Sequence, residues 1–290
     1  MSPAVGFTRG NKVEEYSLEG IRHDSIRRVF ACIPKKGQIS RHEISGMTGL
    51  SLMTVGKITD TLLEKGVVTY AKSDSHSVGR KARHISLAHE KHILVLELDG
   101  GSVRASFADT SLCERFSFTY QQDRQGTDLT DGFMGELMPF IFENGLVGTL
   151  VGVGITYDGA DGLVLAQQLA DVCKNMLSLS ILCVSESLCA KVRAASEGKK
   201  VLYFVRSDGG VRAAVYKNSV ECGSPIRADN EHDMGIAVRA VINFVLPDKV
   251  CFEFENNFDF KNAVTVGKEK ASMLARIGIS EAVREAYLLT

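Results

Sequence analysis

The sequence predicts an α/β protein with an N-terminal winged helix-turn-helix over residues 1–88 and a two-lobed α/β region after it. Two observations predict this division. The first is charge, because residues 1–88 hold 14 Lys and Arg against 8 Asp and Glu, whereas the remaining residues hold 20 against 27. The second is a repeated motif, "LDGGSVRASFAD" at residues 98–109 and "SDGGVRAAVY" at residues 207–216. A basic first part indicates an anionic partner, above all nucleic acid.

The composition is that of a globular protein with room for sizeable cores, because 44% of the 290 residues are hydrophobic. No apolar stretch approaches the roughly 18–20 residues that a membrane-spanning helix needs, and the first residues lack the apolar core of a signal peptide. We therefore expect a cytoplasmic protein that does not bind a membrane. The seven cysteines show no Cys-x-x-Cys spacing, which predicts reduced, buried thiols and no structural metal site.

The first two helices are predicted from apolar spacing and capping residues. An apolar stripe with helical periodicity is formed by Ile21, Ile26, Val29, Phe30 and Ile33. Ser40 caps a second, short helix, and Glu43 at its third position completes a capping box. In that helix Ile44 and Met47 are expected to face inward, and Gly49 supplies the turn that follows.

The third helix is the expected DNA-recognition helix. Ser51 caps it, and Gly66 ends it. Its apolar face is formed by Val55, Ile58 and Leu62. The outward residues at its start, which we expect to meet base edges and phosphates in the major groove, are Ser51, Met53, Thr54 and Lys57.

Residues 67–88 have the pattern of strand, glycine-bearing loop and strand, which is typical of the wing of a winged helix. The basic residues at the tip of the wing, expected to enter a minor groove or bind phosphate, are Arg80, Lys81 and Arg83. The alternative is a small helical adaptor with a solvated basic loop. The caps, the turn, the wing and the basic charge together favour DNA binding.

From about Lys91 the pattern changes to alternating strands and helices. Residues 89–190 are predicted to form a first lobe that begins with a hairpin at Gly100 and Gly101. The same order of hairpin, further strand and helix restarts near residue 200, so residues 191–290 are predicted to form a second lobe with a closing helix that can return to the first. Two similar lobes usually hold a ligand in the cleft between them.

The order of these motifs resembles the ROK family, whose name stands for repressor, open reading frame and kinase. The resemblance is most specific in "ISRHEISGMTGLSLMTVGKITDTLLEKGVV" and in the wing "VGRKAR". In the second part it rests on "LDGGSVRASFAD", "VGVGI", "VLYFVRSDGGVRAAVY" and "AVINFVLPDKV". It implies that the two lobes form an actin- and hexokinase-like (ribonuclease H-like) domain.

The residues that a kinase of this family needs are missing from the sequence. The resemblance implies a catalytic aspartate in a Glu-Asn-Asp triplet, but the matching residues are Ser185, Glu186 and Ser187, with Ser187 at the aspartate position. A serine hydroxyl is too weak a base for this step. We interpret Ser185 and Glu186 as a helix N-terminus, with Ser185 as the cap. The sequence therefore predicts no catalytic residue.

The two glycine hairpins also depart from the family. The family aspartate that precedes the first glycine pair by two residues is replaced by Leu98, and in the second loop Asp208 would repel a phosphate. We interpret these turns as vestigial phosphate loops, formed by Gly100, Gly101, Gly209 and Gly210. The cysteines of the family's zinc site are absent. The residues that we expect to face a ligand cleft are Glu186, Glu231 and His232.

The leading hypothesis is a ROK-type transcription regulator, acting as a repressor, whose kinase-like domain is catalytically inactive and needs no cofactor. Its expected partners are double-stranded operator DNA and a sugar or sugar-phosphate effector. We expect a homodimer or higher homo-oligomer, because two recognition helices in adjacent major grooves read a palindrome. One alternative is an active ATP-dependent sugar kinase with a regulatory N-terminal domain. Another is an interaction protein whose second part is only a dimer scaffold.

Overall fold

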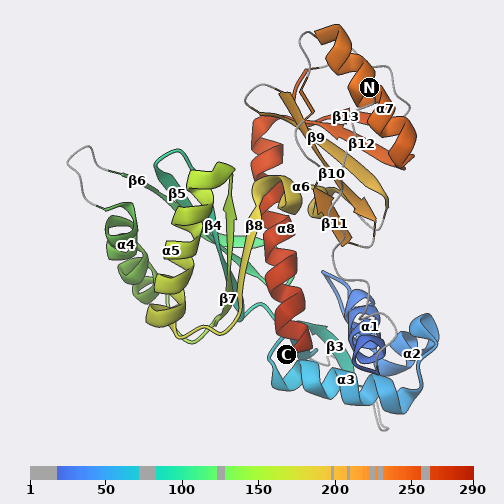
Figure 1. Ribbon diagram of the computed structural model, residues 1–290. Coiled ribbons are helices and arrows are strands. Elements are labelled where there is room, and N and C mark those ends of the chain that lie inside the picture. The colour runs from blue at the N-terminus through green and yellow to red at the C-terminus, as the bar shows by residue number, and fades with distance from the viewer. Residues whose placement is uncertain are drawn as a thin grey trace.

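The computed structural model describes residues 18–71, 83–122, 128–196, 199–207, 210–217, 219–222, 226–227, 231–255 and 262–290. Three sheets organise these residues. The first belongs to a small N-terminal unit, and the other two form the lobes of an α/β region, with the long helix α8 (Lys268–Leu289) running between all three parts (Figure 1).

The N-terminal unit, called here the winged-helix unit, contains three helices and a three-stranded antiparallel sheet in the order β1-β3-β2. Its elements are α1 (Leu18–Ala31), β1 (Ile39–Ser40), α2 (Arg41–Thr48), α3 (Leu52–Glu64), β2 (Val68–Tyr70) and β3 (His84–Leu87). This order of helices and strands is typical of a winged helix-turn-helix.

The predicted caps of α2 and α3 are confirmed. Ser40 and Glu43 form a capping box, in which the Glu43 backbone N donates to Ser40 Oγ at 3.2 Å and the Ser40 backbone N donates to Glu43 Oε2 at 2.8 Å. Hydrogen bonds from the Ser40 side chain and backbone hold the pKa of Glu43 below its ordinary value. Gly49 ends α2 at φ +68°, a left-handed conformation that glycine adopts without strain. Ser51 caps α3 by accepting from the Thr54 backbone N.

Two predicted core positions of this unit are wrong. Met47 is 67% exposed and Ile21 is 57% exposed. The short helix α2 buries only Ile44 and Thr48, which lie one turn apart, and Met47 falls outside that narrow face. Ile21 lies in the first turn of α1, before the buried stripe begins. The fully or largely buried residues of this core include Ile26, Val29, Ile33, Ile44, Val55, Leu62 and Ile85.

The first lobe consists of a five-stranded sheet in the order β6-β5-β4-β7-β8 and two helices. Its elements are β4 (His92–Asp99), β5 (Ser102–Asp109), β6 (Glu114–Gln121), α4 (Leu129–Glu143), β7 (Leu150–Tyr157), α5 (Gly159–Leu177) and β8 (Leu182–Glu186). Alternate residues of β4 face opposite sides of the sheet. Leu94 and Leu96 pack with α4 and α5, whereas Ile93 and Val95 pack with α8.

The second lobe repeats this plan, with strands in the order β11-β10-β9-β12-β13. Its elements are α6 (Ser187–Ser196), β9 (Val201–Ser207), β10 (Gly210–Lys217), β11 (Ser219–Cys222), α7 (Glu231–Val245), β12 (Lys249–Phe252) and β13 (Ala263–Thr265). In both sheets three antiparallel strands are followed by two parallel ones. The internal repeat therefore extends to strand order and direction. Helices α7 and α6 cover opposite faces of this second sheet.

Helices α6 and α8 cross at Gly278, where the absence of a side chain lets the two backbones come close together. A Cβ at Gly278 of α8 would lie 1.9 Å from the carbonyl oxygen of Ala190 in α6, so the two backbones approach each other as only glycine allows. Gly152 and Gly154 of β7 play the same role toward α8, because a Cβ at either would lie within 2.7 Å of Val283 or Ile279. As a result α8 packs directly on the first sheet, while α6 packs on the second.

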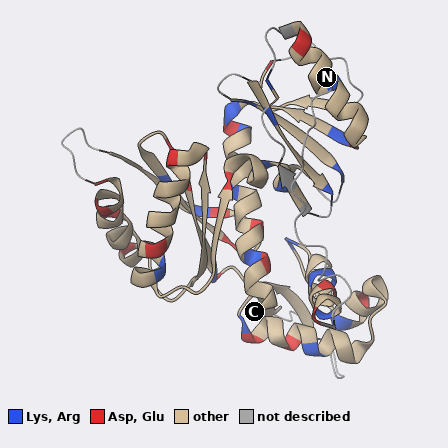
Figure 2. Cartoon of the chain, in the orientation of Figure 1, with Lys and Arg blue, Asp and Glu red and all other residues tan. Residues whose placement is uncertain are grey.

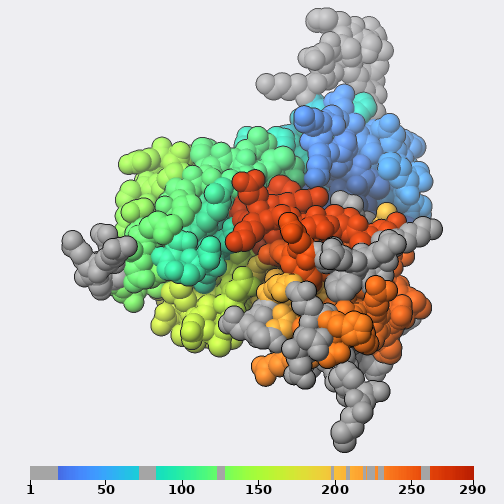
Figure 3. All heavy atoms as spheres, turned by 90° about the horizontal axis from the view of Figure 1, so that it is seen from above, coloured from blue at the N-terminus to red at the C-terminus, as the bar shows by residue number. Residues whose placement is uncertain are grey.

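The C-terminal end of α8 belongs to the core of the winged-helix unit. Leu288 is buried among the apolar residues of α1 and α3. Lys65 Nζ donates to the Tyr287 carbonyl at 2.6 Å, and Tyr287 Oη donates to the Lys65 carbonyl at 2.7 Å. Arg27 of α1 pairs with Glu285 of α8 at 2.5 Å. Figure 3 shows the red atoms of α8 between the green first lobe, the blue winged-helix unit and the orange second lobe.

A buried carboxylate fastens the connection between β3 and β4. Asp109, which is fully buried, accepts hydrogen bonds from Ser111, from the Cys113 backbone N at 3.1 Å and from Arg115 Nε at 2.8 Å, and it lies 2.9 Å from His89 Nδ1. Burial raises the pKa of Asp109, but these hydrogen bonds outweigh it and hold the pKa below its ordinary value. Since His89 lies in the connecting segment, the network restrains the winged-helix unit relative to the first lobe.

We predict that Gly278→Ala destabilises the protein by about 1–3 kcal/mol, because the added methyl group forces the α6 and α8 backbones apart. Urea unfolding followed by circular dichroism measures the change. The matched control is Gly135→Ala in the exposed face of α4, where a Cβ meets nothing within 4 Å. This control should gain about 0.5–1 kcal/mol from helix propensity. A Gly278→Ala variant as stable as its parent would contradict the crossing described here.

We also predict that the contribution of Asp109 to stability is lost in acid. A carboxyl whose folded-state pKa is depressed stabilises the protein above its unfolded pKa of about 3.9, and this stability disappears as pH falls through the folded pKa. Asp109→Asn should therefore be less stable than the parent by about 2–3 kcal/mol near pH 6, and the difference should shrink toward about pH 3. Urea unfolding at both pH values tests this. A difference independent of pH would show that the charge of Asp109 is not what stabilises the fold.

Candidate functional site

The solvent-facing side of α3 is set by its helical periodicity. Val55, Thr59 and Leu62 are buried, so the opposite side carries Met53, which is 73% exposed, and Lys57, which is also exposed. These two predicted DNA-contacting residues therefore share one open helical face. It carries one extended apolar side chain and one positive charge.

The hydroxyl groups at the start of α3 are partly used within the helix. Ser51 Oγ accepts from the Thr54 backbone N at 3.2 Å and lies 2.9 Å from Thr54 Oγ1. Ser51 thus satisfies one of the free N–H groups at the helix start. Both residues remain at the N-terminal end of the helix, where a recognition helix meets DNA.

An ion pair with α2 offsets the negative charge of an acidic residue on the same face of α3. Asp60 lies on the exposed side of α3 and is paired with Arg41 of α2. Arg41 Nη2 also lies 3.5 Å from Tyr70 Oη in β2. Figure 2 shows Lys and Arg side by side with acidic residues on these helices, so the face depends on local pairing and not on a uniform positive surface.

At the wing, Arg83 is exposed, and its guanidinium carbon lies 5.1 Å from the ring centre of Tyr70, which fixes the residue by a cation–π contact. The other two predicted wing residues, Arg80 and Lys81, lie outside the described residues. A contact of all three with DNA stays a prediction.

A second cluster of charged side chains lies where the two lobes meet, and we call it the junction cluster: Asp158, Glu186, Lys191, Arg212 and Glu253. Glu186 at the end of β8 forms a two-pronged ion pair with Arg212 of β10, and the Arg212 Nη2 to Glu186 Oε2 distance is 2.9 Å. This hydrogen bonding raises the pKa of Arg212. The pair links the last strand of the first lobe to the second lobe, and it engages both carboxylate oxygens of Glu186.

Lys191 and Glu253 form the second pair of the junction cluster. Lys191 Nζ lies 3.1 and 3.0 Å from the two carboxylate oxygens of Glu253, and the side chains are only 9% and 16% exposed. Tyr203 Oη donates to the same carboxylate at 3.3 Å. Burial together with the nearby charge of Glu253 raises the pKa of Tyr203, so its phenol is protonated. Breaking a buried pair of this kind leaves an uncompensated charge and is costly.

Asp158 completes the junction cluster at the start of α5. The residue is exposed as a whole, yet the protein around its carboxyl raises its pKa by desolvation, and the nearby Glu186 and Glu253 raise it further. Lys191 and a hydrogen bond with Ser187 act in the opposite direction. Ser187, at the position where the resemblance implies a catalytic aspartate, is buried at 5% exposure.

The predicted ligand residues have different surroundings. Glu186 is paired with Arg212. His232 is exposed on α7, and no hydrogen bond or ion pair joins it to Glu186 in the described part of the chain. The side chain of Glu231 lies outside what the structure describes. The interpretation of Ser185 as a helix cap is wrong, because Ser185 belongs to β8 and its hydroxyl donates to the Glu186 carbonyl at 3.2 Å. A shared role of Glu186, Glu231 and His232 in ligand binding stays a prediction.

The two glycine turns have structural explanations that need no phosphate. Gly100 and Gly101 have φ of +50° and +102° in a two-residue hairpin between Asp99 and Ser102, a turn that favours glycine. A Cβ at Gly210 would lie 2.2 Å from the Ile226 carbonyl oxygen, so the chain itself occupies the space beside this glycine. Gly209 lies outside the described residues.

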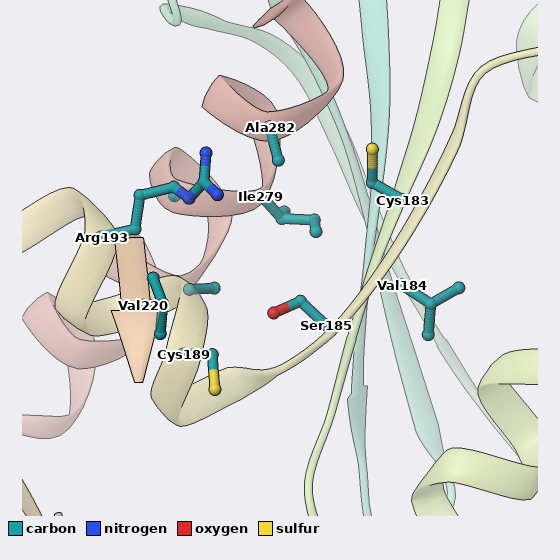
Figure 4. A pocket seen from close by; sticks show the side chains of 10 residues that line it. Cys183, Val184, Ser185, Cys189, Arg193, Val220, Ile279 and Ala282 are labelled. Carbon is teal, nitrogen blue, oxygen red and sulfur yellow. The ribbon is translucent and has the colours of Figure 1, made fainter. Parts of the chain in front are cut away.

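A pocket of about 190 Å³ lies where β8, α6, β11 and α8 meet. Figure 4 shows Ser185 and Val184 on opposite sides of β8, with Arg193 of α6 near Ile279 and Ala282 of α8. Burial raises the pKa of the Cys183 thiol in this pocket. The expectation of reduced thiols throughout is wrong for Cys189, which is disulfide-bonded. Folding brings its sulfur to a partner that the scattered spacing of the cysteines does not reveal.

Two kinds of feature are absent from the described residues. These residues contain no group of three or more His, Cys, Asp or Glu side chains placed to hold a metal ion. Within the same residues, no helix combines the length and the apolar character that crossing a membrane requires.

No protein-family model and no curated protein sequence matches this chain. Among solved structures, the chain is similar to a ROK family transcriptional regulator described as a homologue of the E. coli Mlc protein, with a TM-score of 0.70 and 14% identity over 93% of this chain and 98% of that one. It is also similar to a ROK hexokinase from Thermus thermophilus, with a TM-score of 0.48 and 11% identity over 66% of this chain and 99% of that one. A polyphosphate/ATP-glucomannokinase from Arthrobacter sp. strain KM gives a TM-score of 0.44 and 12% identity over 67% and 98%.

The similarity to the regulator extends over nearly the whole of both chains, so it concerns the fold as a unit. The chain is therefore an α/β protein with the fold of that regulator, in which the N-terminal winged-helix unit precedes two lobes that are each built on a five-stranded mixed sheet. This is the fold class that the sequence predicts.

Most of the junction cluster was not predicted from the sequence. Asp158, Glu186 and Glu253 each lie at or directly after the carboxyl end of a parallel strand, in β7, β8 and β12. In α/β sheets this edge is where polar side chains converge and ligands bind. The position of the acidic residues after apolar runs was therefore a usable signal, although it could not reveal that Glu186 pairs with Arg212 and Glu253 with Lys191.

Proposed function

We propose that this protein is a DNA-binding transcription regulator of the ROK type. The observation that carries the proposal is the open face of α3 in a winged-helix unit, presented by a protein whose whole fold matches that of a ROK regulator. Lys57 would contact a phosphate, and Met53 would pack against base edges, where thymine methyl groups offer apolar contacts. The protein acts in the cytoplasm as a repressor at a palindromic operator, as a homodimer or higher homo-oligomer.

The junction cluster supports the proposal that the two lobes no longer transfer phosphate. Proton abstraction from a sugar hydroxyl needs a free base. Glu186 is held by Arg212, and Ser187 stands where the resemblance implies the catalytic aspartate. The space beside Gly210 is occupied by the backbone of Ile226. In this proposal the lobes serve as an effector and dimerisation domain for a sugar or sugar phosphate.

We predict that Lys57→Ala weakens DNA binding at least roughly tenfold and reduces the log–log salt slope by about 2, because the proposed homodimer loses one phosphate contact in each protomer. The operator is first selected from random double-stranded DNA with the full chain, and the affinity is then measured by fluorescence anisotropy at several salt concentrations. Lys174→Ala is the matched control, since Lys174 is an exposed helical lysine on α5 of the first lobe. Equal affinities and slopes for Lys57→Ala and the parent would rule out the proposed docking.

We further predict that the protein forms no ADP when it is incubated with ATP, magnesium and a panel of hexoses. The physical reason is that Glu186 at the β8–α6 junction is held by Arg212 and that Ser187 stands at the position where the resemblance implies the catalytic aspartate. A coupled assay for ADP measures the rate against a blank without sugar. Sugar-dependent turnover that Glu186→Gln abolishes would support the alternative, an active sugar kinase with a regulatory N-terminal domain.

A further inference from the structure

A cavity of about 810 Å³ lies between the winged-helix unit, the two lobes and α8. Residues of α1 and β3 line one side of it, and residues of α6, β10 and β11 line another. The last turns of α8 and Ser111 of the first lobe complete the wall. Its volume falls in the range of roughly 300–1,000 Å³ that is typical of small-molecule sites. It is separate from the junction cluster, none of whose residues lines it.

The charged side chains that line this cavity have an excess of positive charge. Four of them are basic and two are acidic: Arg27, Lys35, Arg193, Arg284, Glu281 and Glu285. Glu285 is already engaged, because it pairs with Arg27 at 2.5 Å and with Arg193 at 3.3 Å. This chain of contacts joins α1 of the winged-helix unit to α8 and to α6 of the second lobe. The cavity therefore lies beside the ion pairs that connect the parts of the molecule.

Arg284 and Lys35 supply the positive charge that remains. Arg284 Nη1 donates to the Thr110 carbonyl at 3.2 Å, and its guanidinium carbon lies 5.2 Å from the ring centre of Phe30, but no carboxylate of the described residues lies within ion-pair distance of it. Burial lowers the pKa of Arg284, which reflects a positive charge held away from water. Lys35 is exposed at the rim of the cavity and has no ion-pair partner among the described residues. Glu281 supplies nearby negative charge to both groups without forming an ion pair with either. A bound anion could form the direct contact with Arg284 and Lys35 that no described carboxylate makes.

Glu281 and the apolar side chains that line the cavity place two further requirements on a ligand. Glu281 is half-buried, and no described residue forms a hydrogen bond or an ion pair with its carboxylate. A ligand hydroxyl or amino group would satisfy it. Phe30, Leu87 and Leu288 offer apolar surface in the same cavity. The matching ligand thus combines a negative group, a hydrogen-bond donor and a small apolar part.

We propose that this cavity binds a small organic anion carrying a hydroxyl or amino donor, and that the bound anion changes how the winged-helix unit sits against the second lobe. Because Arg27 and Arg193 approach Glu285 from opposite walls, a ligand that draws either arginine away weakens the link between α1 and α6. The ligand then favours whichever arrangement binds it better. The binding site stands on the cavity alone, whereas the effect on DNA rests on the proposed function.

The test begins with binding to the full chain by isothermal titration calorimetry. The probes are inorganic phosphate, D-glucose 6-phosphate, L-malate and L-glutamate, with neutral D-glucose as the control for charge. At least one of the organic anions should bind saturably and more tightly than inorganic phosphate. A ligand that binds only the folded protein should also raise the melting temperature.

Two variants locate the bound anion, and one serves as a matched control. Lys35→Gln should raise the Kd of the anion at least about fivefold. Ala31→Trp should raise the Kd at least about tenfold, because Ala31 is exposed at the same rim and a large side chain there occupies part of the cavity. Lys36→Gln should change the Kd less than about twofold, since Lys36 is an equally exposed neighbour that does not line the cavity. These surface positions leave the folded cores untouched.

Three outcomes decide the proposal. Binding of no organic anion, or binding that Lys35→Gln and Ala31→Trp leave unchanged, would overturn the site and place any ligand elsewhere, including between the lobes. Binding with the predicted pattern but no change in operator affinity would overturn the regulatory role. Binding with that pattern in a protein that selects no DNA sequence would instead overturn the proposed function and leave the site in place.

Discussion

The close contact between Gly278 of α8 and the Ala190 carbonyl of α6 is the constraint on which the rest of the molecule depends. It allows the last helix of the chain to lie against the first sheet while its start packs with the second lobe and its end enters the winged-helix unit. Ala271, Ile279 and Leu288 belong to three different apolar cores along this one helix. A change in the angle between the lobes would therefore reach the winged-helix unit through one continuous helix.

The charged contacts complement this apolar arrangement. The ion pair between Glu186 and Arg212 joins the two lobes. Glu285 of α8 pairs with both Arg27 of α1 and Arg193 of α6, so it joins α1 to both helices of the crossing. Ion pairs at such positions contribute little net stability when they are exposed, but they select one arrangement over others because an unpaired, partly buried charge is costly. At the junction of the two lobes, the carboxylates of Glu186 and Glu253 are paired with Arg212 and Lys191.

The sequence allowed the order of elements, the caps at Ser40 and Ser51, and the repeat of the two lobes to be predicted, because each depends on local periodicity or on a turn chemistry that short motifs carry. The buried face of α2 was predicted less well, since Met47 obeys the apolar pattern but lies outside the two positions that face the core. The pairing of Glu186 with Arg212 could not be predicted. It depends on the packing of two lobes, and no spacing along the chain encodes it. The same holds for the disulfide of Cys189 and for the cavity beside α8.

The central claim, that α8 couples the winged-helix unit to both lobes, is tested most directly by native-state hydrogen exchange of the full chain in increasing urea. If α8 couples these parts, the slowest amides of α3 in the winged-helix unit and of β4 in the first lobe exchange through the same opening, with free energies that agree within about 1 kcal/mol. If the amides of α3 instead exchange through a separate opening that is several kcal/mol less costly, the winged-helix unit is an independent domain and the coupling through α8 is wrong.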